Sequence, residues 1–213
     1  MKDIVVIGAG GFAREVIWLI EEINKQKLTW NILGYIDEDI KKHNILLNGY
    51  KVLGDYKWFN NKENIYYVCA IGNSKIRKKI VEEKINKYYI KAATLIHPSV
   101  SIDNKTTEIG EGTIICSHSS ITVNIKIKNH CIVNLNSTIG HDVTIENYVT
   151  VYPNASISGN CALDEAVELG TGARIIQGKA VGKNAIIGAG AVVINDIEEN
   201  TTNVGVPSKV IKR

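Results

Sequence analysis

The 213-residue chain lacks the charge pattern of a nucleic-acid-binding protein and the long apolar segment of a membrane protein. Its formal net charge is only +3, and its lysines and arginines form no block that would follow a phosphate backbone. No apolar run approaches the roughly 18 residues that a membrane-spanning helix needs. Met1 and Lys2 lead straight into an apolar segment, without a secretory signal. We therefore expect a cytoplasmic protein with no nucleic-acid partner and no membrane insertion.

Cysteine is sparse as well. The four cysteines show no CxxC spacing, which argues against the usual cysteine-based metal and redox motifs; they are Cys69, Cys116, Cys131 and Cys161. Cys131 and Cys161 fall on small, inward positions of the repeat described next, so we expect buried, reduced thiols. Such thiols fit a cytoplasmic location.

What the chain does have is a period of six residues. Fifteen consecutive positions spaced six apart are aliphatic, and the residue four places after each is mostly Thr, Ser, Cys, Val or Ala. A hexapeptide period indicates a parallel β-helix, whose narrow interior takes one large residue and a small one beside each corner. An ordinary sheet with alternating residues would not hold this phase for so long. The fifteen positions are Ile109, Ile115, Ile121, Ile127, Val133, Ile139, Ile145, Val151, Ile157, Leu163, Leu169, Ile175, Val181, Ile187 and Val193.

The chain before this repeat has a different pattern, so we expect two domains and a tail. Residues 1–93 alternate short apolar strands with segments of helical spacing, which predicts a small parallel βαβ domain, half of a Rossmann-like fold with about three strands. The predicted strands are 3–8, 31–37 and 65–72, and the predicted helices are 13–24 and 75–86, the second capped by Ser74. The β-helix follows over 94–200, with a one-residue insertion between Ile102 and Ile109, and residues 201–213 form a tail outside the repeat.

A glycine turn follows the first predicted strand. Residues 8–13, Gly-Ala-Gly-Gly-Phe-Ala, match G-x-G-x-x-G/A between a strand and a helix, where free N–H groups meet phosphate oxygens. Asp37 ends the second strand, and Gly72 and Asn73 follow the third, at the same carboxyl edge of the sheet. The domain is about half the size of a full dinucleotide-binding fold, so it suits a nucleotide or nucleotide sugar better than NAD. The alternative is that the glycines serve only a tight turn and close helix packing.

The histidine spacing argues against a metal site within one chain. Residues that stack in a β-helix lie 18 apart, but His118 and His130 are 12 apart and His141 is 23 after His118. The imidazoles therefore do not converge as a zinc site requires, although ligands from a neighbouring chain remain open. His43 and His97 lie outside the repeat, and we interpret them as structural or solvated.

His141 is the candidate general base. It occupies an outward position of its hexad, and Asp142 follows directly, where a carboxylate can fix the imidazole tautomer and raise its basicity. One coil later, at 141 + 18, stands Gly159, which leaves room beside the ring and offers a backbone N–H to a developing oxyanion. Asn134 is another polar group nearby. A solvated surface histidine is the alternative on these residues alone.

Several segments together resemble the bacterial hexapeptide-repeat sugar acetyltransferases. This family includes nucleotide-linked 4-amino-sugar N-acetyltransferases and sialic-acid O-acetyltransferases. The resemblance spans essentially the whole chain, and the combination is specific although each motif alone is not. The segments are GAGGFAR (8–14), YIDE (35–38), AIGNSKIRK (70–78), NLNSTIGHD (134–142) and GVPSK (205–209).

The resemblance implies a left-handed β-helix, a homotrimer with active sites between neighbouring β-helices, and acetyl-CoA as co-substrate without a metal. His141 matches the family's base and Asp142 its acidic companion. The implied acetyl-CoA contacts are Asn134, Thr150, Gly159, Gly172, Gly190 and Lys209, and the implied nucleotide-sugar contacts are Gly8, Gly10, Gly11, Phe12, Asp37, Glu38, Gly72 and Asn73. Two positions depart from the family pattern: many relatives carry histidine where this chain has Thr150, and some carry histidine where it has Phe12.

The leading hypothesis is direct N-acetylation of a nucleotide-linked 4-amino-4,6-dideoxy sugar, with His141 as base. Two alternatives remain: O-acetylation of a sialic-acid type of acceptor, and a trimer that binds nucleotide sugars without catalysis. None of the four cysteines is placed as a nucleophile. We expect the trimer interface to use outward apolar residues, such as Ile114, Val123, Ile132 and Ile186.

Overall fold

The computed structural model describes residues 1–212 and begins with a six-stranded sheet. The strand order is β3-β4-β2-β1-β5-β6, and β1 pairs in parallel with both β2 and β5. Its elements are β1 (Lys2–Ile7), α1 (Gly11–Gln26), β2 (Trp30–Ile36), η1 (Ile40–Lys42), β3 (Leu46–Leu47), β4 (Tyr50–Gly54), η2 (Tyr56–Phe59), β5 (Ile65–Cys69) and β6 (Lys91–Ala92). The expectation of about three strands is therefore too low. The three that were missed are β3 and β6, with two residues each, and β4, which pairs with β2 by only a few residues; such short segments carry no readable period.

The second helical segment also differs from the prediction. It starts as α2 (Ser74–Lys79), continues as the π-helical η3 (Ile80–Ile85) and ends as the 3₁₀ segment η4 (Asn86–Tyr88). Asn73, not Ser74, is the N-cap, because its side-chain oxygen accepts the Ile76 N–H at 2.9 Å. Ser74 instead contacts the β-helix, as described below.

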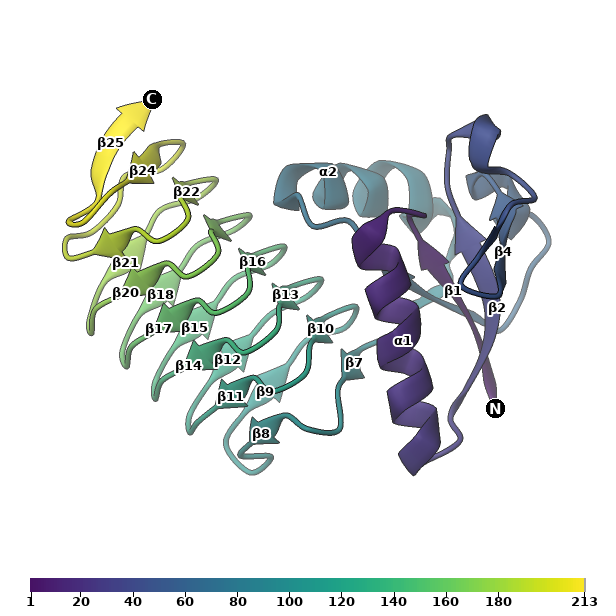
Figure 1. Cartoon of the computed structure of the whole chain (residues 1–213), viewed down its shortest axis with the longest axis horizontal. Helices are drawn as coiled ribbons and strands as arrows, with labels where there is room; N and C mark the ends of the chain where they lie inside the picture. Colours follow the sequence, from purple (N-terminus) through teal and green to yellow (C-terminus); the bar gives the residue numbers. More distant parts are fainter. Residues whose placement is uncertain (213) are drawn as a thin grey trace.

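From Leu95 onward the chain winds into a left-handed parallel β-helix with three faces (Figure 1). Residues 18 apart pair along each face, for example Ile127 with Ile145 and Ile139 with Ile157. The predicted insertion is present, since Ile102 pairs with Ile121, 19 residues on. The inward aliphatics form one continuous core along the axis. The fold expected from the period of six is confirmed.

We call the three sheets the first, second and third faces. The first face contains β7 (Leu95–Ile96), β10 (Ile114–Ile115), β13 (Ile132–Val133), β16 (Thr150–Val151), β19 (Glu168–Leu169), β22 (Ile186–Ile187), β24 (Thr202–Val204) and β25 (Lys209–Lys212). The second contains β8 (Ser101–Ile102), β11 (Ser120–Ile121), β14 (Thr138–Ile139), β17 (Ser156–Ile157), β20 (Arg174–Ile175) and β23 (Val192–Val193). The third contains β9 (Glu108–Ile109), β12 (Lys126–Ile127), β15 (Thr144–Ile145), β18 (Ala162–Leu163) and β21 (Ala180–Val181).

The N-terminal domain packs on the first face. Helix α1 runs beside β7 in Figure 1, and its Ala13 and Val16 share a buried cluster with Ile114 and Ile132 of the β-helix. Ile114 and Ile132 are therefore almost fully buried within the chain, and the expectation that they form an exposed interface is wrong. Outward apolar residues at this end of the prism serve the contact between the two domains.

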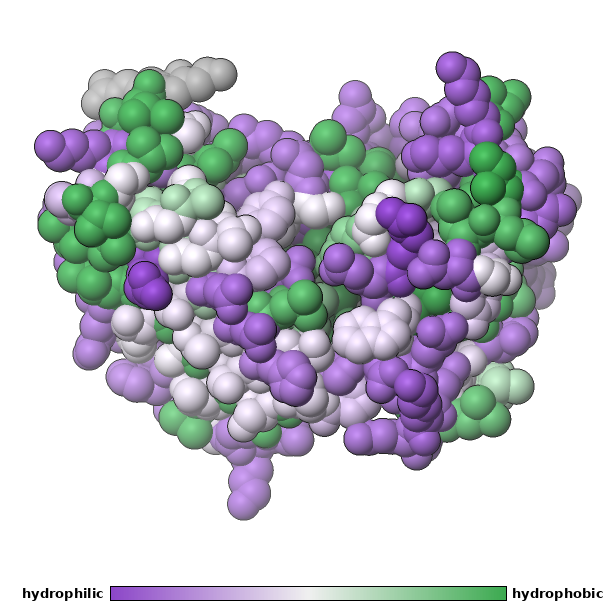
Figure 2. All heavy atoms as spheres, in the orientation of Figure 1, coloured by the Kyte–Doolittle hydropathy of each residue, from purple (hydrophilic) through white to green (hydrophobic). Residues whose placement is uncertain are grey.

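Exposed apolar side chains gather instead at the other end of the prism. Figure 2 shows apolar surface around the C-terminal end of the β-helix, where Val206, Val210 and Ile211 are exposed. The predicted tail is only partly outside the repeat, because β24 extends the first face beside β22 and β25 folds back antiparallel to it.

Arg213 lies outside the described residues. Over residues 1–212, no helix has the length and apolar character to cross a membrane, and all four cysteines are buried free thiols.

Candidate active site

His141 lies in the turn between β14 and β15, at the edge where the second and third faces meet. Its Nδ1 lies 2.8 Å from Asp142 Oδ2, and both side chains are about half exposed. Asp142 has a left-handed backbone, φ 59°, and its other oxygen accepts a hydrogen bond from Asn124, one coil earlier. These hydrogen bonds, first that with His141, lower the pKa of the Asp142 carboxyl. The predicted pair is therefore formed, with Nε2 of the imidazole directed away from the carboxylate.

Gly159 lies directly against this imidazole. A β-carbon at Gly159 would stand 2.4 Å from both Cε1 and Nε2 of His141, which no real contact permits. The amides of Ser158 and Asn160 are bonded to carbonyls of neighbouring coils, whereas the Gly159 N–H has no acceptor among the described residues. The position thus offers both room for the ring and a donor beside Nε2.

Gly159→Ala is expected to displace the His141 ring and to lower kcat at least about 10-fold, because about 1 Å of misplacement costs up to 10² in rate. Stability should change little, since the glycine has no left-handed φ. Gly49→Ala, between β3 and β4 of the N-terminal domain and with open space around it, tests whether any glycine replacement has the same effect. Steady-state kinetics check the difference, and a Gly159→Ala enzyme with normal kcat would contradict it.

Most of the remaining implied acetyl-CoA residues lie on a different edge. Asn134, Gly172 and Gly190 occupy turns between first-face and second-face strands, whereas His141 and Gly159 lie between the second and third faces. Asn134 is largely buried, and its side-chain oxygen accepts the Leu135 N–H. Gly172 and Gly190 have positive φ and open space around them. A single chain does not bring Asn134 next to His141.

Thr150 does not fit an acetyl-CoA contact. It is 1% exposed on the outward side of β16, under the N-terminal domain. Its hydroxyl donates to the Gly72 carbonyl at 2.7 Å and accepts from Arg77 at 2.9 Å. Because both bonds lie within the chain, no ligand reaches this hydroxyl, and the expectation for Thr150 is corrected: it joins the two domains.

Sequence reasoning missed Arg77, which is buried at this junction. Its guanidinium donates to the carbonyls of His130 (2.9 Å), Ile71 (2.6 Å) and Tyr148 (2.7 Å). Burial lowers the pKa of Arg77, but guanidinium remains charged in proteins. The side chain ties the loop after β5 to two successive turns of the β-helix. In the sequence, Arg77 lies among the lysines of 75–84, and nothing distinguishes it from a basic residue on an exposed helix face.

A second missed contact fixes the start of α2. Glu168, mostly buried on β19, accepts the Ser74 N–H at 2.8 Å and lies 2.9 Å from the Ser74 hydroxyl. Its other oxygen accepts from the Tyr152 hydroxyl at 3.2 Å. Burial, with Glu168 nearby, raises the pKa of Tyr152 to about 12. A carboxylate at the amino end of a helix is favourable, so Glu168 holds the loop containing Gly72 and Asn73 against the β-helix.

The glycine turn leaves the amino end of α1 free. Helix α1 begins after Gly10 without a side-chain cap, so the N–H groups of its first turn are available to bind an anion. Gly8 has φ 98°, and a β-carbon there would stand 2.8 Å from Ile71. Gly10 and Gly11 have open space. Phe12 packs partly buried against the cluster shared by α1 and the first face.

Asp37 supports this turn from the end of β2. Its Oδ2 accepts the Ala9 N–H at 2.9 Å and lies 3.1 Å from Lys42 Nζ, and its Oδ1 accepts the Asp39 N–H. His43 contacts the Asp37 carbonyl through Nε2 at 2.8 Å. Asp37 therefore shapes the turn, while the exposed Glu38 beside it has no hydrogen bond or ion pair among residues 1–212.

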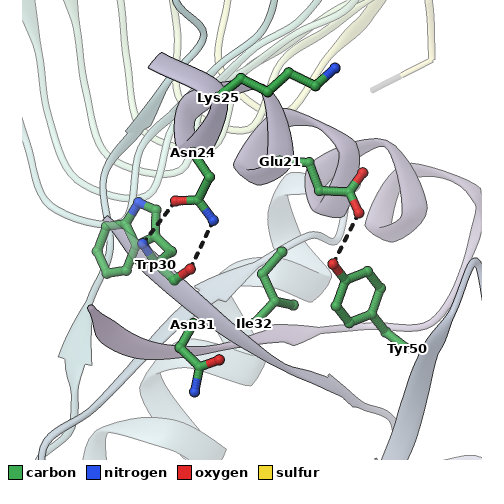
Figure 3. A pocket seen from close by; sticks show the side chains of 7 residues that line it. All are labelled: Glu21, Asn24, Lys25, Trp30, Asn31, Ile32 and Tyr50. Carbon is green, nitrogen blue, oxygen red and sulfur yellow. Dashed lines mark hydrogen bonds between the residues drawn. The ribbon is translucent and has the colours of Figure 1, made fainter. Parts of the chain in front are cut away.

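A cavity of about 450 Å³ lies elsewhere on the N-terminal domain (Figure 3). It is formed by the last turns of α1 and the start of β2, where Tyr50 donates to Glu21 and Asn24 bonds the backbone of Trp30. This is the amino end of β2, opposite to the glycine turn, so the cavity is not joined to the predicted nucleotide site.

No cluster of three or more metal-binding side chains occurs in the part of the chain that the structure describes. His130 is buried, and burial lowers its pKa to about 4, so the ring is neutral; it stacks on Tyr148. His97 is also largely buried and contacts Ser99. These histidines serve packing.

Comparison with known proteins identifies relatives that share the fold of the whole chain. Residues 3–84 match the family described as the PglD N-terminal domain, and a sequence comparison with curated proteins finds no match. The acetyltransferase domain of PglB from Neisseria gonorrhoeae is 29% identical with a TM-score of 0.89, covering 99% of this chain and 100% of that chain; it has also been solved with acetyl coenzyme A. PerB from Caulobacter crescentus, in complex with CoA and GDP-perosamine, is 25% identical with a TM-score of 0.88, covering 99% and 97%.

WeeI from Acinetobacter baumannii AYE is 31% identical with a TM-score of 0.87, and the match covers 99% of this chain and 100% of that chain. The chain thus shares its whole length with these proteins, from the glycine turn to the last coil. It belongs to the hexapeptide-repeat sugar acetyltransferases and is an acetyl-CoA-dependent sugar N-acetyltransferase.

Proposed function

We propose that the protein N-acetylates the amino group of a nucleotide-linked 4-amino-4,6-dideoxy sugar by direct transfer from acetyl-CoA, with His141 as general base. The main support for this proposal is the His141–Asp142 pair beside Gly159. The unpaired N–H of Gly159 and the free Nε2 of His141 lie next to each other on one edge of the β-helix. PerB, with the same fold, was solved with CoA and a GDP-linked sugar. The buried free thiols fit the reducing cytoplasm, where we place the enzyme.

The chemistry needs only groups that this edge presents. The sugar amine attacks the thioester carbonyl while His141 Nε2 accepts its proton. The carbonyl oxygen gains negative charge, which the Gly159 N–H stabilises. The carbon–sulfur bond then breaks, and the proton passes from His141 to the CoA sulfur, which leaves the imidazole neutral again. Asp142 holds Nδ1–H throughout and stabilises the imidazolium between the two proton transfers.

We propose that each active site is shared between neighbouring chains. The N-terminal domain covers the first face, and His141 stands on the edge opposite that face. A sugar held at Gly72 of one chain is therefore remote from the His141 of that chain. Asn134, Gly172 and Gly190 line one of the two edges that border the face covered by the N-terminal domain, so this edge of one chain and the His141 edge of its neighbour complete one groove.

A homotrimer is expected, with a mass in solution three times the 23.5 kDa of the chain. Exposed apolar residues at the His141 edge, namely Val123, Ile176 and Ile194, are the kind of surface that a neighbouring chain covers. Multi-angle light scattering checks the mass. A stable monomer with full activity would contradict both the trimer and the shared site.

The assay that tests the function measures thiol release from acetyl-CoA with a panel of nucleotide-linked amino sugars, followed by mass spectrometry of the product. A gain of one acetyl group on a 4-amino sugar supports the proposal. Acetylation of the corresponding hydroxyl sugar instead would favour the O-acetyltransferase alternative. Tight nucleotide-sugar binding without thiol release would favour the trimer that binds without catalysis.

A further inference from the structure

The edge that carries His141 holds a second polar side chain one coil earlier. Asn124 lies in the turn between β11 and β12, 18 residues before Asp142. Its backbone is left-handed, with φ 56°, and its side-chain Nδ2 donates to Asp142 Oδ1 at 3.1 Å. The group of side chains that leads to the imidazole therefore begins at least one coil before His141.

Asp142 is held at both of its carboxylate oxygens. Oδ2 lies 2.8 Å from Nδ1 of His141, and Oδ1 accepts the hydrogen bond from Asn124. The terminal torsion of a carboxylate is broad, so one hydrogen bond leaves the group free to rotate, whereas a bond to each oxygen fixes its plane. Only a donor can serve at Oδ1, because an ionised carboxylate accepts hydrogen bonds and does not donate them.

Asn124 is itself supported from the preceding coil, in a way that differs from the next turn on this edge. The Asp142 N–H donates to a backbone carbonyl, that of Val123. The Asn124 N–H donates instead to the Thr106 hydroxyl at 2.8 Å, and this hydroxyl donates in turn to Asp103. The extra residue of the repeat lies in the turn that contains Thr106. A side chain there takes the place of the backbone carbonyl and holds Asn124 in position.

Left-handed positions favour asparagine for its backbone alone, so the residue type by itself says nothing about catalysis. What does is the direction of its amide, toward the carboxylate that orients the candidate base. Resting on the proposed function, we propose that Asn124 is a positioning residue for acetyl transfer. Its amide holds the Asp142 carboxylate against Nδ1 of His141, so that the lone pair of Nε2 stays directed at the sugar amine.

Two replacements of Asn124 separate this role from a structural one. Aspartate tolerates a left-handed backbone as asparagine does, so Asn124→Asp keeps the turn but places a second carboxylate against Asp142. Its kcat is expected to fall about 5–10-fold, as the loss of one hydrogen bond to a charged group allows. Both KM values should stay within about 2-fold, because the interaction acts on proton transfer. Asn124→Ala, which only removes the donor, should lower kcat less. A purely structural role predicts the reverse order, with the aspartate variant near normal.

A matched control lies on another edge of the β-helix. Asn184 also has a left-handed φ, 58°, and its side chain donates to Asn200 Oδ1 at 3.0 Å. Asn184→Asp should therefore keep the kcat of the unaltered protein. If Asn124 acts through Asp142, adding Asn124→Ala to Asp142→Ala should change kcat by less than about 2-fold. Normal kcat in Asn124→Asp, or independent losses in the double variant, would overturn the assignment.

Nitrogen-15 NMR of the His141 imidazole gives a readout that needs no substrate. The unaltered protein is expected to show the tautomer with the proton on Nδ1, and Asn124→Asp a mixture of both tautomers. The same tautomer in both proteins would also overturn the assignment. Thiol release that Asn124→Asp leaves unchanged removes this inference alone. Absence of thiol release with every amino sugar removes the proposed function, and the tautomer still decides whether Asn124 orients the ring.

Discussion

Replacing His141 with alanine is expected to lower kcat by about 10²–10⁴-fold, the usual contribution of a positioned general base. The KM values for acetyl-CoA and the sugar nucleotide should change little, because proton transfer is an interaction of the transition state alone. The half-exposed ring anchors no core cluster, so the variant should remain folded and trimeric. Steady-state kinetics with circular dichroism and light scattering on the same samples measure all three.

Asp142→Asn is a milder variant to compare with His141→Ala. It keeps the shape of the side chain and the hydrogen bond from Asn124 but removes the charge that orients the imidazole and stabilises its protonated form. Its loss of kcat should be smaller than that of His141→Ala. Near-normal turnover in His141→Ala would leave the site without an identified base, and the mechanism would then have to be abandoned.

Arg77→Met is expected to produce the largest loss of stability, about 3–5 kcal/mol, because it removes a buried donor that several carbonyls share. The variant leaves the carbonyls of His130, Ile71 and Tyr148 in a buried junction without the donor they now have, and an unpartnered buried polar group costs about 1–3 kcal/mol. Thermal and denaturant unfolding measure the change, at matched protein concentration because assembly contributes to apparent stability.

Lys79→Met provides the matched control on the same helix. Lys79 is exposed and forms no hydrogen bond or ion pair among residues 1–212, so its replacement should alter stability by less than about 0.5 kcal/mol. If Arg77→Met behaves like this control, the guanidinium is not what joins the two domains. Binding of the sugar nucleotide should also weaken in Arg77→Met, because the loop at Gly72 loses its support.

The β-helix was predictable because its constraint repeats. Each coil must place an aliphatic residue such as Ile145 or Val151 inside, and the same demand recurs along the whole axis. The pairing of His141 with Asp142, and the place of Gly159 against the ring, followed from adjacency and from the spacing of 18 alone.

What the sequence could not show depends on contacts between the domains. Thr150 and Ile132 occupy outward positions of the repeat, which look alike whether solvent, a neighbouring chain or the same chain covers them. The N-terminal domain covers both. Likewise, Asn134 is only seven residues before His141 in the sequence. Between them the chain crosses the second face, so the two residues lie on different edges of the β-helix.

The regular rise of the β-helix also sets the length of the groove. Each turn of the solenoid advances about 4.8 Å along the axis, the spacing of neighbouring strands. Adding or removing one whole turn would move one end of the groove along the axis by about this distance without rotating it. The groove would then fit a longer or shorter acetyl-CoA arm. The single extra residue of this chain lies between Ile102 and Ile109, before the turn that carries His141. The groove therefore keeps one common phase from that turn as far as Val193, whereas in the last coil residues only 16 apart pair, such as Ile186 with Thr202.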